Sequence, residues 1–339
     1  MEKISISIGQ LLRQLLNDFT GKDSQSGYTY TYVWMANQLG HFALGFVFVS
    51  ISGWFFIESI KQNPFGVYAL VLLAIMALWL VYEIINTWSS INHALKEASF
   101  KPDVFQIVFD AITDVFIIWL GAFSAYFGLY NPVVGLCVFW GGFVIVFIVA
   151  MYWLKLKMYF QQGDYPSFNR LSDLQVNLSE SDKEQIMLFT QLKSKWKVLL
   201  IFGKAKSGRT SLASAIATEH ALKDGITRYT TLFKLIQLFQ TQEPYSNKGV
   251  NQIWPWRSAE ILVVDDVEPS TPGISPVSID TISNALDLAP FASDNVSALR
   301  NNTSVWVMGL PDNISEWQKL FVDKTIVSNT DEVGVIVLE

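Results

Sequence analysis

The sequence predicts a multi-domain chain, in which an all-α bundle of four transmembrane helices precedes an α/β domain built on a parallel sheet. Three observations lead to this fold class: four long apolar stretches, a change of composition near residue 156, and a strand, glycine loop and helix after residue 197. The predicted domains are an N-terminal segment (1–31), the bundle (32–155), a linker with a lead-in helix (156–196) and the α/β domain (197–339).

The composition separates the two halves of the chain. Of the 339 residues, 51% are hydrophobic, which is high for an ordinary soluble protein. Residues 1–155 hold 7 Lys and Arg and 9 Asp and Glu, whereas residues 156–339 hold 17 and 21. The net charge of −6 offers no basic surface for nucleic acid, so nucleic acid is not an expected partner. The single cysteine, Cys137, allows no intrachain disulfide.

The four apolar stretches cover 32–57, 66–88, 104–129 and 132–154. Each is long enough for the ~20 residues that a spanning helix needs. Four such runs in succession favour membrane spans over buried helices of a large soluble domain. Basic residues are concentrated on one side of the spans, which predicts an inner-membrane protein with both termini in the cytoplasm. The cytoplasmic basic residues are Lys3, Arg13, Lys22, Lys96, Lys101, Lys155 and Lys157, and the outer loops hold only Lys61.

Residues 4–19 predict an amphipathic cytoplasmic helix that lies on the inner leaflet and contacts bilayer lipid. Its apolar side chains recur at helical spacing; they are Ile8, Leu11, Leu12, Leu15, Leu16 and Phe19. A cleaved signal peptide is not expected, because the first apolar stretch begins too far from the N-terminus.

Ionisable side chains inside the predicted spans are costly and therefore mark a membrane polar site. The members of this site are His41, Glu83, Asp110 and Asp114. Asp110 and Asp114 are four residues apart and share one helix face. Two interpretations stay open: a cation or proton site inside the bundle, or side chains that hydrogen-bond to neighbouring helices or to another subunit. Small residues such as Gly121 and Gly141 would allow close helix contact.

A phosphate-binding pattern follows the first predicted strand of the second half. The run VLLIF at 198–202 leads into GKAKSGRTS at 203–211 and then into a helix former, which fits the Walker A spacing G-x-x-x-x-G-K-[ST] except for Arg209. Glycines let backbone N–H groups surround the phosphates, and Thr210 would ligate Mg²⁺. The predicted nucleotide-binding residues are Gly203, Lys206, Ser207, Gly208, Arg209, Thr210 and Ser211.

Arg209 stands where such loops carry lysine, and the two side chains are not interchangeable. A planar guanidinium is larger than an ammonium group and prefers a bidentate grip, so we expect nucleotide binding to survive and hydrolysis to be slow. Lys204 and Lys206 could supply a substitute charge, or could simply be solvated loop residues.

A second motif, EILVVDD at 260–266, is a hydrophobic strand that ends in two acids, as in a Walker B segment. Asp265 would hold Mg²⁺, and Asp266 would polarise an attacking water. ATP and Mg²⁺ are therefore the predicted cofactors. Adenine is favoured over guanine because the late region lacks an N/T-K-x-D signature, to which only VDKT at 322–325 comes near.

Residues 197–312, about a third of the chain, resemble the AAA+ core of helicase-loader and transposition-helper ATPases. The resemblance is carried by LASAIATEHALKDGITRYTTLFKLIQLF followed by ILVVDDV, in the order and spacing of that family. It implies a P-loop NTPase fold, a nucleotide site and assembly into a homo-oligomer.

The chain departs from this family after the acidic pair. The family carries a polar sensor residue at the end of the strand that here reads MGLP at 308–311, with Asp312 and Asn313 arriving late. No arginine follows Arg300, so the family's C-terminal lid with its sensor arginine is missing. Arg300 is the candidate arginine finger offered in trans to a neighbouring subunit, with a surface role as the alternative.

Two functional hypotheses follow. The first is a membrane-anchored nucleotide-binding protein that acts as an oligomeric switch or effector, coupling nucleotide state to a membrane response; analogy of architecture places it in prokaryotic defence or stress. The second is an active membrane-bound AAA+-like ATPase, with Asp266 as a catalytic residue, that drives a partner or a transport process. A third interpretation is a domain that only scaffolds a protein partner. The departures at Arg209, the sensor and the lid favour the switch.

Overall fold

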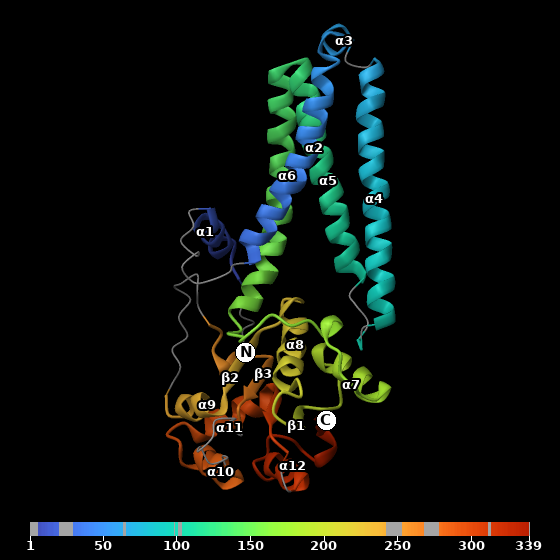
Figure 1. The fold of residues 1–339 in the computed structure, drawn as a ribbon. Coiled ribbons are helices and arrows are strands. Elements are labelled where there is room, and N and C mark those ends of the chain that lie inside the picture. Colours follow the sequence, from blue (N-terminus) through green and yellow to red (C-terminus); the bar gives the residue numbers. More distant parts are fainter. Residues whose placement is uncertain are drawn as a thin grey trace. The chain divides into compact units, whose positions relative to one another are not determined.

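The computed structural model describes residues 6–19, 30–63, 66–97, 99–100, 104–241, 253–267, 278–310 and 313–338 (Figure 1). Of the residues named from the sequence, Lys3, Lys22, Lys101, Pro311 and Asp312 lie outside this description. The chain divides into two compact units. The helical unit comprises Leu11–Glu97 and Pro102–Leu154, and the sheet unit comprises Met1–Gln10, Ala98–Lys101 and Lys155–Glu339.

The first half of the chain is helical. Its helices are α1 (Ile8–Phe19), α2 (Tyr30–Trp54), α3 (Ile57–Gln62), α4 (Val67–Glu97), α5 (Val104–Tyr130) and α6 (Pro132–Gln161). Three segments in the described part are long and apolar enough to cross a membrane: Tyr68–His93, Val104–Tyr130 and Pro132–Gln161. The first predicted span forms α2, which is not among these three. A bundle of four spans therefore stays a prediction.

Helices α2 and α5 lie side by side and meet at two glycines (Figure 1). A methyl group added at Gly45 would lie 1.9 Å from the carbonyl oxygen of Ile118, and one added at Gly121 would lie 2.1 Å from that of Phe42. Only glycine allows the two backbones to approach so closely, as in small-residue packing between membrane helices. A methyl group at Gly141, in contrast, would have no atom within 4 Å, so no close packing inside the described part of the single chain requires this glycine, and a contact of Gly141 with another subunit stays a prediction.

Helix α1 forms within the segment where an amphipathic helix was predicted. Leu11 and Leu15 are buried, whereas Ile8 and Leu16 are 72% and 61% exposed. The helix therefore keeps an exposed apolar side, and its contact with lipid stays a prediction.

The sheet unit contains a five-stranded parallel sheet with the order β2-β3-β4-β1-β5. Its strands are β1 (Val198–Gly203), β2 (Thr227–Thr231), β3 (Ile261–Asp265), β4 (Thr303–Met308) and β5 (Val333–Leu338). The predicted α/β domain with a parallel sheet is thus confirmed. Because parallel strands end at the same edge, the glycine loop after β1 and the two acids after β3 share that edge, with β4 between them.

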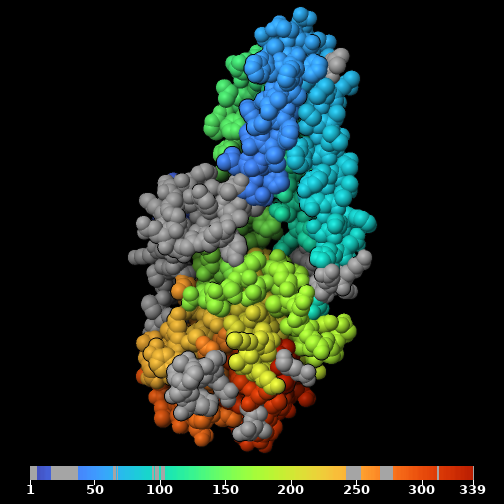
Figure 2. All heavy atoms as spheres, viewed as in Figure 1, coloured from blue at the N-terminus to red at the C-terminus, as the bar shows by residue number. Residues whose placement is uncertain are grey.

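Helices cover both faces of this sheet. One cluster of buried side chains joins the sheet to α7 (Glu180–Thr190) and α8 (Arg209–Ala221); the other joins it to α9 (Leu232–Phe239), α10 (Ile279–Leu288), α11 (Ala292–Asn301) and α12 (Ile314–Asp323). On β1, Leu199 and Ile201 face the first cluster, while Leu200 and Phe202 face the second. Every residue of β1 is buried, as expected of a central parallel strand. From residue 155 onward, Figure 2 shows a closely packed body.

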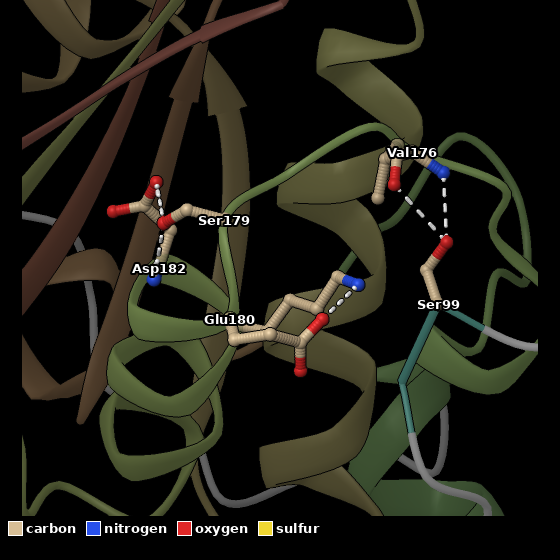
Figure 3. Close-up of polar contacts among 6 residues, drawn as sticks. Ser99, Val176, Ser179, Glu180 and Asp182 are labelled. Atoms are coloured by element: carbon tan, nitrogen blue, oxygen red, sulfur yellow. Dashed lines mark hydrogen bonds and ion pairs between the residues drawn. The ribbon is translucent and has the colours of Figure 1, made fainter.

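Two residues that the sequence places between two predicted spans belong to the sheet unit. Phe100 is 2% exposed and lies in the core cluster of β1 and α8. The Ser99 hydroxyl accepts a hydrogen bond from the Val176 N–H and donates one to the Val176 carbonyl oxygen, both at 3.1 Å (Figure 3). A few residues further on, Ser179 caps α7 by accepting from the Asp182 N–H at 3.1 Å (Figure 3).

The segment predicted as a linker is attached to the sheet. Helix α6 continues to Gln161, beyond the end at 154 predicted for the last span, and the chain then follows the edge strand β2. The Tyr229 N–H donates to the Gly163 carbonyl oxygen at 2.7 Å. The lead-in helix predicted at 180–195 forms as α7 and ends at Thr190.

Candidate nucleotide-binding site

The glycine loop joins β1 to α8 in a conformation suited to binding an anion. Gly208, with φ 88°, lies in the left-handed region that favours glycine, and it begins α8 without a side-chain cap. The first N–H groups of α8 therefore have no side-chain acceptor, which is the arrangement that binds phosphate at a helix N-terminus. Lys206 also adopts a left-handed φ of 69°. A methyl group at Gly203 would lie 2.5 Å from the Ser207 Oγ, so this position also requires glycine.

The two predicted motifs meet in one pocket of about 260 Å³. Its lining residues are Lys206, Gly208, Arg209, Thr210, Ser211, Asp265, Asp266 and Val307. Gly203, Ser207 and Lys204 belong to the same loop and do not line the pocket. The loop of β1 and the acids of β3 are thus brought together by the strand order.

Asp265 ends β3 with both carboxylate oxygens in hydrogen bonds. It is 3% exposed; Oδ2 accepts from the Tyr229 hydroxyl at 2.6 Å, and Oδ1 accepts from the Asp266 N–H at 2.7 Å. Each oxygen keeps a second lone pair, so the carboxylate can still bind a metal ion. The sequence analysis missed Tyr229, although its position on the strand that neighbours β3 could have identified it once the strand order was known.

Asp266 follows Asp265 in a left-handed conformation, with φ 53°. Burial and the neighbouring Asp265 charge raise the pKa of Asp266, and the Arg209 guanidinium opposes this effect. Arg209 therefore acts electrostatically on the acid placed to polarise water as well as on any phosphate in the pocket.

The pocket fits Mg²⁺ bound together with a nucleotide. In the described ranges, no group of three or more His, Cys, Asp or Glu side chains is arranged to hold a metal ion by itself. Mg²⁺ at phosphate sites uses one or two protein ligands, with phosphate oxygens and waters completing the octahedron. The Thr210 hydroxyl and the Asp265 carboxylate, both lining the pocket, meet this requirement.

The residues considered for sensing and for the arginine finger lie elsewhere. Strand β4 contributes the apolar Val307 to the pocket. Asn313 caps α12, accepting from the Ser315 N–H at 3.1 Å. Arg300, on α11, donates to the Thr325 carbonyl oxygen at 2.8 Å and to its hydroxyl at 2.6 Å, and it does not line the pocket. A finger role in trans stays a prediction, and it would require these bonds to break.

The predicted membrane polar site is partly assembled within the helical unit. Gln38 Nε2 donates to Asp114 Oδ1 at 2.9 Å, and His41 Nε2 lies 3.6 Å from Asp114 Oδ2. Asp110 interacts electrostatically with both Asp114 and His41. Glu83 accepts from Asn86 on its own helix, at 3.4 Å. These contacts are those expected of polar side chains that join neighbouring helices.

Comparisons with known proteins add little to this geometry. No protein-family model matches the chain, and no curated protein is similar to it. Among solved structures, the chain is similar to the crystal structure of DnaI, with 17% sequence identity, a TM-score of 0.29, and coverage of 50% of this chain and 88% of that chain. A TM-score of 0.29 is too low to establish a shared fold. The P-loop NTPase-like fold of the sheet unit rests on its own strand order and loop.

Proposed function

We propose that this chain is a membrane-anchored nucleotide-binding protein, which binds ATP with Mg²⁺ and acts as an oligomeric switch that couples nucleotide state to a membrane response. The observation that carries the proposal is the single pocket lined by Arg209, Thr210 and Asp265. A helix N-terminus for phosphate and a carboxylate for Mg²⁺ are the two elements that a nucleoside triphosphate requires.

Slow turnover follows from two features of the pocket and one residue outside it. Arg209 replaces the compact lysine ammonium, Val307 offers no hydrogen bond from β4, and Arg300 is bonded to Thr325 of its own chain. Phosphoryl transfer depends on charges positioned around the transferring group. A pocket with fewer such charges can still bind ATP but hydrolyses it slowly.

Coupling to the membrane is supported by the chain segments that belong to the sheet unit. Phe100 lies in the core beside α8, and Lys155, on the last turns of α6, pairs with Asp224. Phe100 precedes the candidate span Val104–Tyr130 in sequence, and Lys155 lies within the candidate span Pro132–Gln161. A rearrangement of the sheet unit on nucleotide binding can therefore act on the chain that enters the helical unit. The proposed setting is prokaryotic defence or stress, with homo-oligomerisation through the spans.

A second candidate function is an active membrane-bound ATPase. It is favoured by Asp266, which lines the pocket and whose pKa is raised by burial and by the Asp265 charge. A raised carboxyl pKa is a property of groups that exchange protons during catalysis.

The test uses the full chain in detergent or nanodiscs. Fluorescent ATP and GTP analogues are titrated with and without Mg²⁺, and we expect Mg²⁺-dependent binding of the ATP analogue. Thr210→Ala is expected to weaken that binding by a factor of roughly ten or more, since it removes a metal ligand. Thr218→Ala, on the buried side of the same helix, is the matched control. Failure of both nucleotides to bind would reject the proposal.

Turnover and assembly separate the two candidate functions. If the chain is a switch, steady-state ATP hydrolysis is slow and Asp266→Asn leaves it unchanged, while nucleotide alters the oligomeric state measured by mass photometry. If the chain is an ATPase, Asp266→Asn lowers the rate by a factor of roughly 100 or more. A ring seen by electron microscopy would also locate Arg300 relative to the neighbouring subunit's pocket.

A further inference from the structure

Tyr229, on the edge strand β2, makes one hydrogen bond through its side chain and another through its backbone. Its hydroxyl donates to Asp265 Oδ2 at 2.6 Å, and its backbone N–H donates to the Gly163 carbonyl oxygen at 2.7 Å. Asp265 is the metal-binding carboxylate of the proposed nucleotide site. Gly163 lies two positions after Gln161, the last residue of α6, and α6 contains the last candidate span.

We propose that Tyr229 is a positioning residue. It orients the Asp265 carboxylate for Mg²⁺, and it couples metal binding to the conformational stability of residues 162–165. The inference rests on the proposed nucleotide site and names a regulation of that site. Carboxylates that bind metal ions are usually held by further hydrogen bonds, which fix their orientation and tune their affinity.

The register of the sheet explains how the phenol reaches the acid. Strand β2 pairs with β3 in parallel, and Thr231 lies opposite Asp265. Tyr229 is two residues earlier on the same side of β2, so its long side chain extends along the strand toward Asp265. The half-buried ring packs against the core cluster of α8, which restricts the directions in which the hydroxyl can donate.

The chemistry of the two groups keeps this hydrogen bond in one direction. A carboxylate oxygen only accepts, whereas the Tyr229 hydroxyl carries a proton and donates it to Asp265 Oδ2. The second lone pair of Oδ2 stays available to a metal ion.

Residues 162–165 contact β2 itself and two segments beside it, helix α9 and the chain that leads into β3. The Gln162 carbonyl oxygen accepts from the Trp254 N–H at 2.8 Å, and Asp164 pairs with Lys234 at 3.2 Å. The Tyr165 hydroxyl bonds to the Thr227 hydroxyl. A shift of Tyr229 on metal binding consequently moves a strand edge to which the end of α6 is attached.

The test is the Mn²⁺ affinity of the full chain with saturating ATP, measured by electron paramagnetic resonance. Tyr229→Phe keeps the ring and removes the hydroxyl, and we expect Mn²⁺ affinity to fall roughly 10- to 100-fold, the usual effect of losing a partner of a metal ligand. ATP affinity in EDTA should be unchanged, which distinguishes positioning from general damage to the pocket. Tyr165→Phe is the matched control for metal affinity, because it removes the hydroxyl of a half-buried tyrosine on the same edge, which bonds to Thr227 and does not touch Asp265.

A second measurement follows the response of residues 162–165 to metal, in wild type and in Tyr229→Phe. Hydrogen exchange at residues 162–165 is compared in wild type with ATP and Mg²⁺ against ATP and EDTA, and metal is expected to add protection that Tyr229→Phe removes. The positioning role would be overturned if Tyr229→Phe bound Mn²⁺ within twofold of wild type. It would also be overturned if Tyr165→Phe lost as much Mn²⁺ affinity as Tyr229→Phe. Absence of metal-dependent exchange in wild type would overturn the coupling. If wild type binds no nucleotide, the proposed function itself fails, and this inference fails with it.

Discussion

The two units place their apolar side chains in opposite ways. In the sheet unit, all six residues of β1 are buried and Trp306 is 1% exposed. In the helical unit, Trp54 and Trp88 are 75% and 68% exposed. Burial from water accounts for the first pattern. The second is expected of helices whose outer surface faces lipid, where polar contacts and close backbone packing provide the specificity instead.

The largest expected effect contrasts two tryptophans. Trp306→Ala leaves a cavity beside Phe321, whose ring centroid lies 5.2 Å away, and should lower the free energy of unfolding of the sheet unit by roughly 3–5 kcal/mol. Trp88→Ala should change the stability of the helical unit in detergent by no more than about 0.5 kcal/mol. Urea unfolding followed by hydrogen exchange in each unit measures both. Equal losses would mean that the exposed apolar surface of α4 is covered by protein.

A smaller effect is expected at the glycines of the helical unit. Gly121→Ala introduces a methyl group 2.1 Å from the Phe42 carbonyl oxygen and should destabilise the contact of α2 with α5 by roughly 1–3 kcal/mol. Gly141→Ala meets no atom within 4 Å and should be neutral, or stabilising by up to about 1 kcal/mol through helix propensity. Thermal unfolding of the two variants in the same detergent makes the comparison. A destabilised Gly141→Ala would instead indicate a contact with another subunit.

The smallest effect is electrostatic and lies in the sheet unit. Because the pKa of Asp266 is raised in the folded chain, its contribution to stability is present below the ordinary aspartate pKa of about 4 and is lost as pH rises through the raised value. Asp266→Asn should therefore unfold at a higher temperature than wild type at pH 7 and lose this advantage at acid pH. Although the pocket partly removes its carboxyl group from water, Asp266 as a whole residue is exposed and screened, so the gain should stay below about 1 kcal/mol. A variant less stable than wild type at pH 7 would contradict the repulsion between the two acids.

Local patterns in the sequence predicted much of this structure. The run at 198–202, the glycine loop and the acids at 265 and 266 identified β1, β3 and every residue that lines the pocket except Val307, because each of these motifs depends on a few adjacent residues. The parallel arrangement of the sheet also agrees with the prediction.

Contacts between distant segments could not be predicted in the same way. The hydrogen bond from Tyr229 to Asp265 depends on the pairing of β2 with β3, and the sequence of neither strand specifies which strand lies beside it. Gln38 joins Asp114 only because Gly45 and Gly121 bring α2 against α5. Polar residues of this kind are recognised in sequence as costly, whereas their partners come from tertiary packing.

Phe100 also constrains how the protein is made and studied. Its side chain completes the core of a domain whose first strand begins nearly a hundred residues later, at Val198. During synthesis, this core can close only after α5, α6 and the strands of the sheet unit have left the ribosome, so both candidate spans are complete before the sheet unit reaches its final packing. A recombinant fragment that starts after α6 would lack this aromatic ring and carry a hole in its core, with reduced stability as the expected result. Any shortened form of the protein made for biochemistry should retain the segment between α4 and α5.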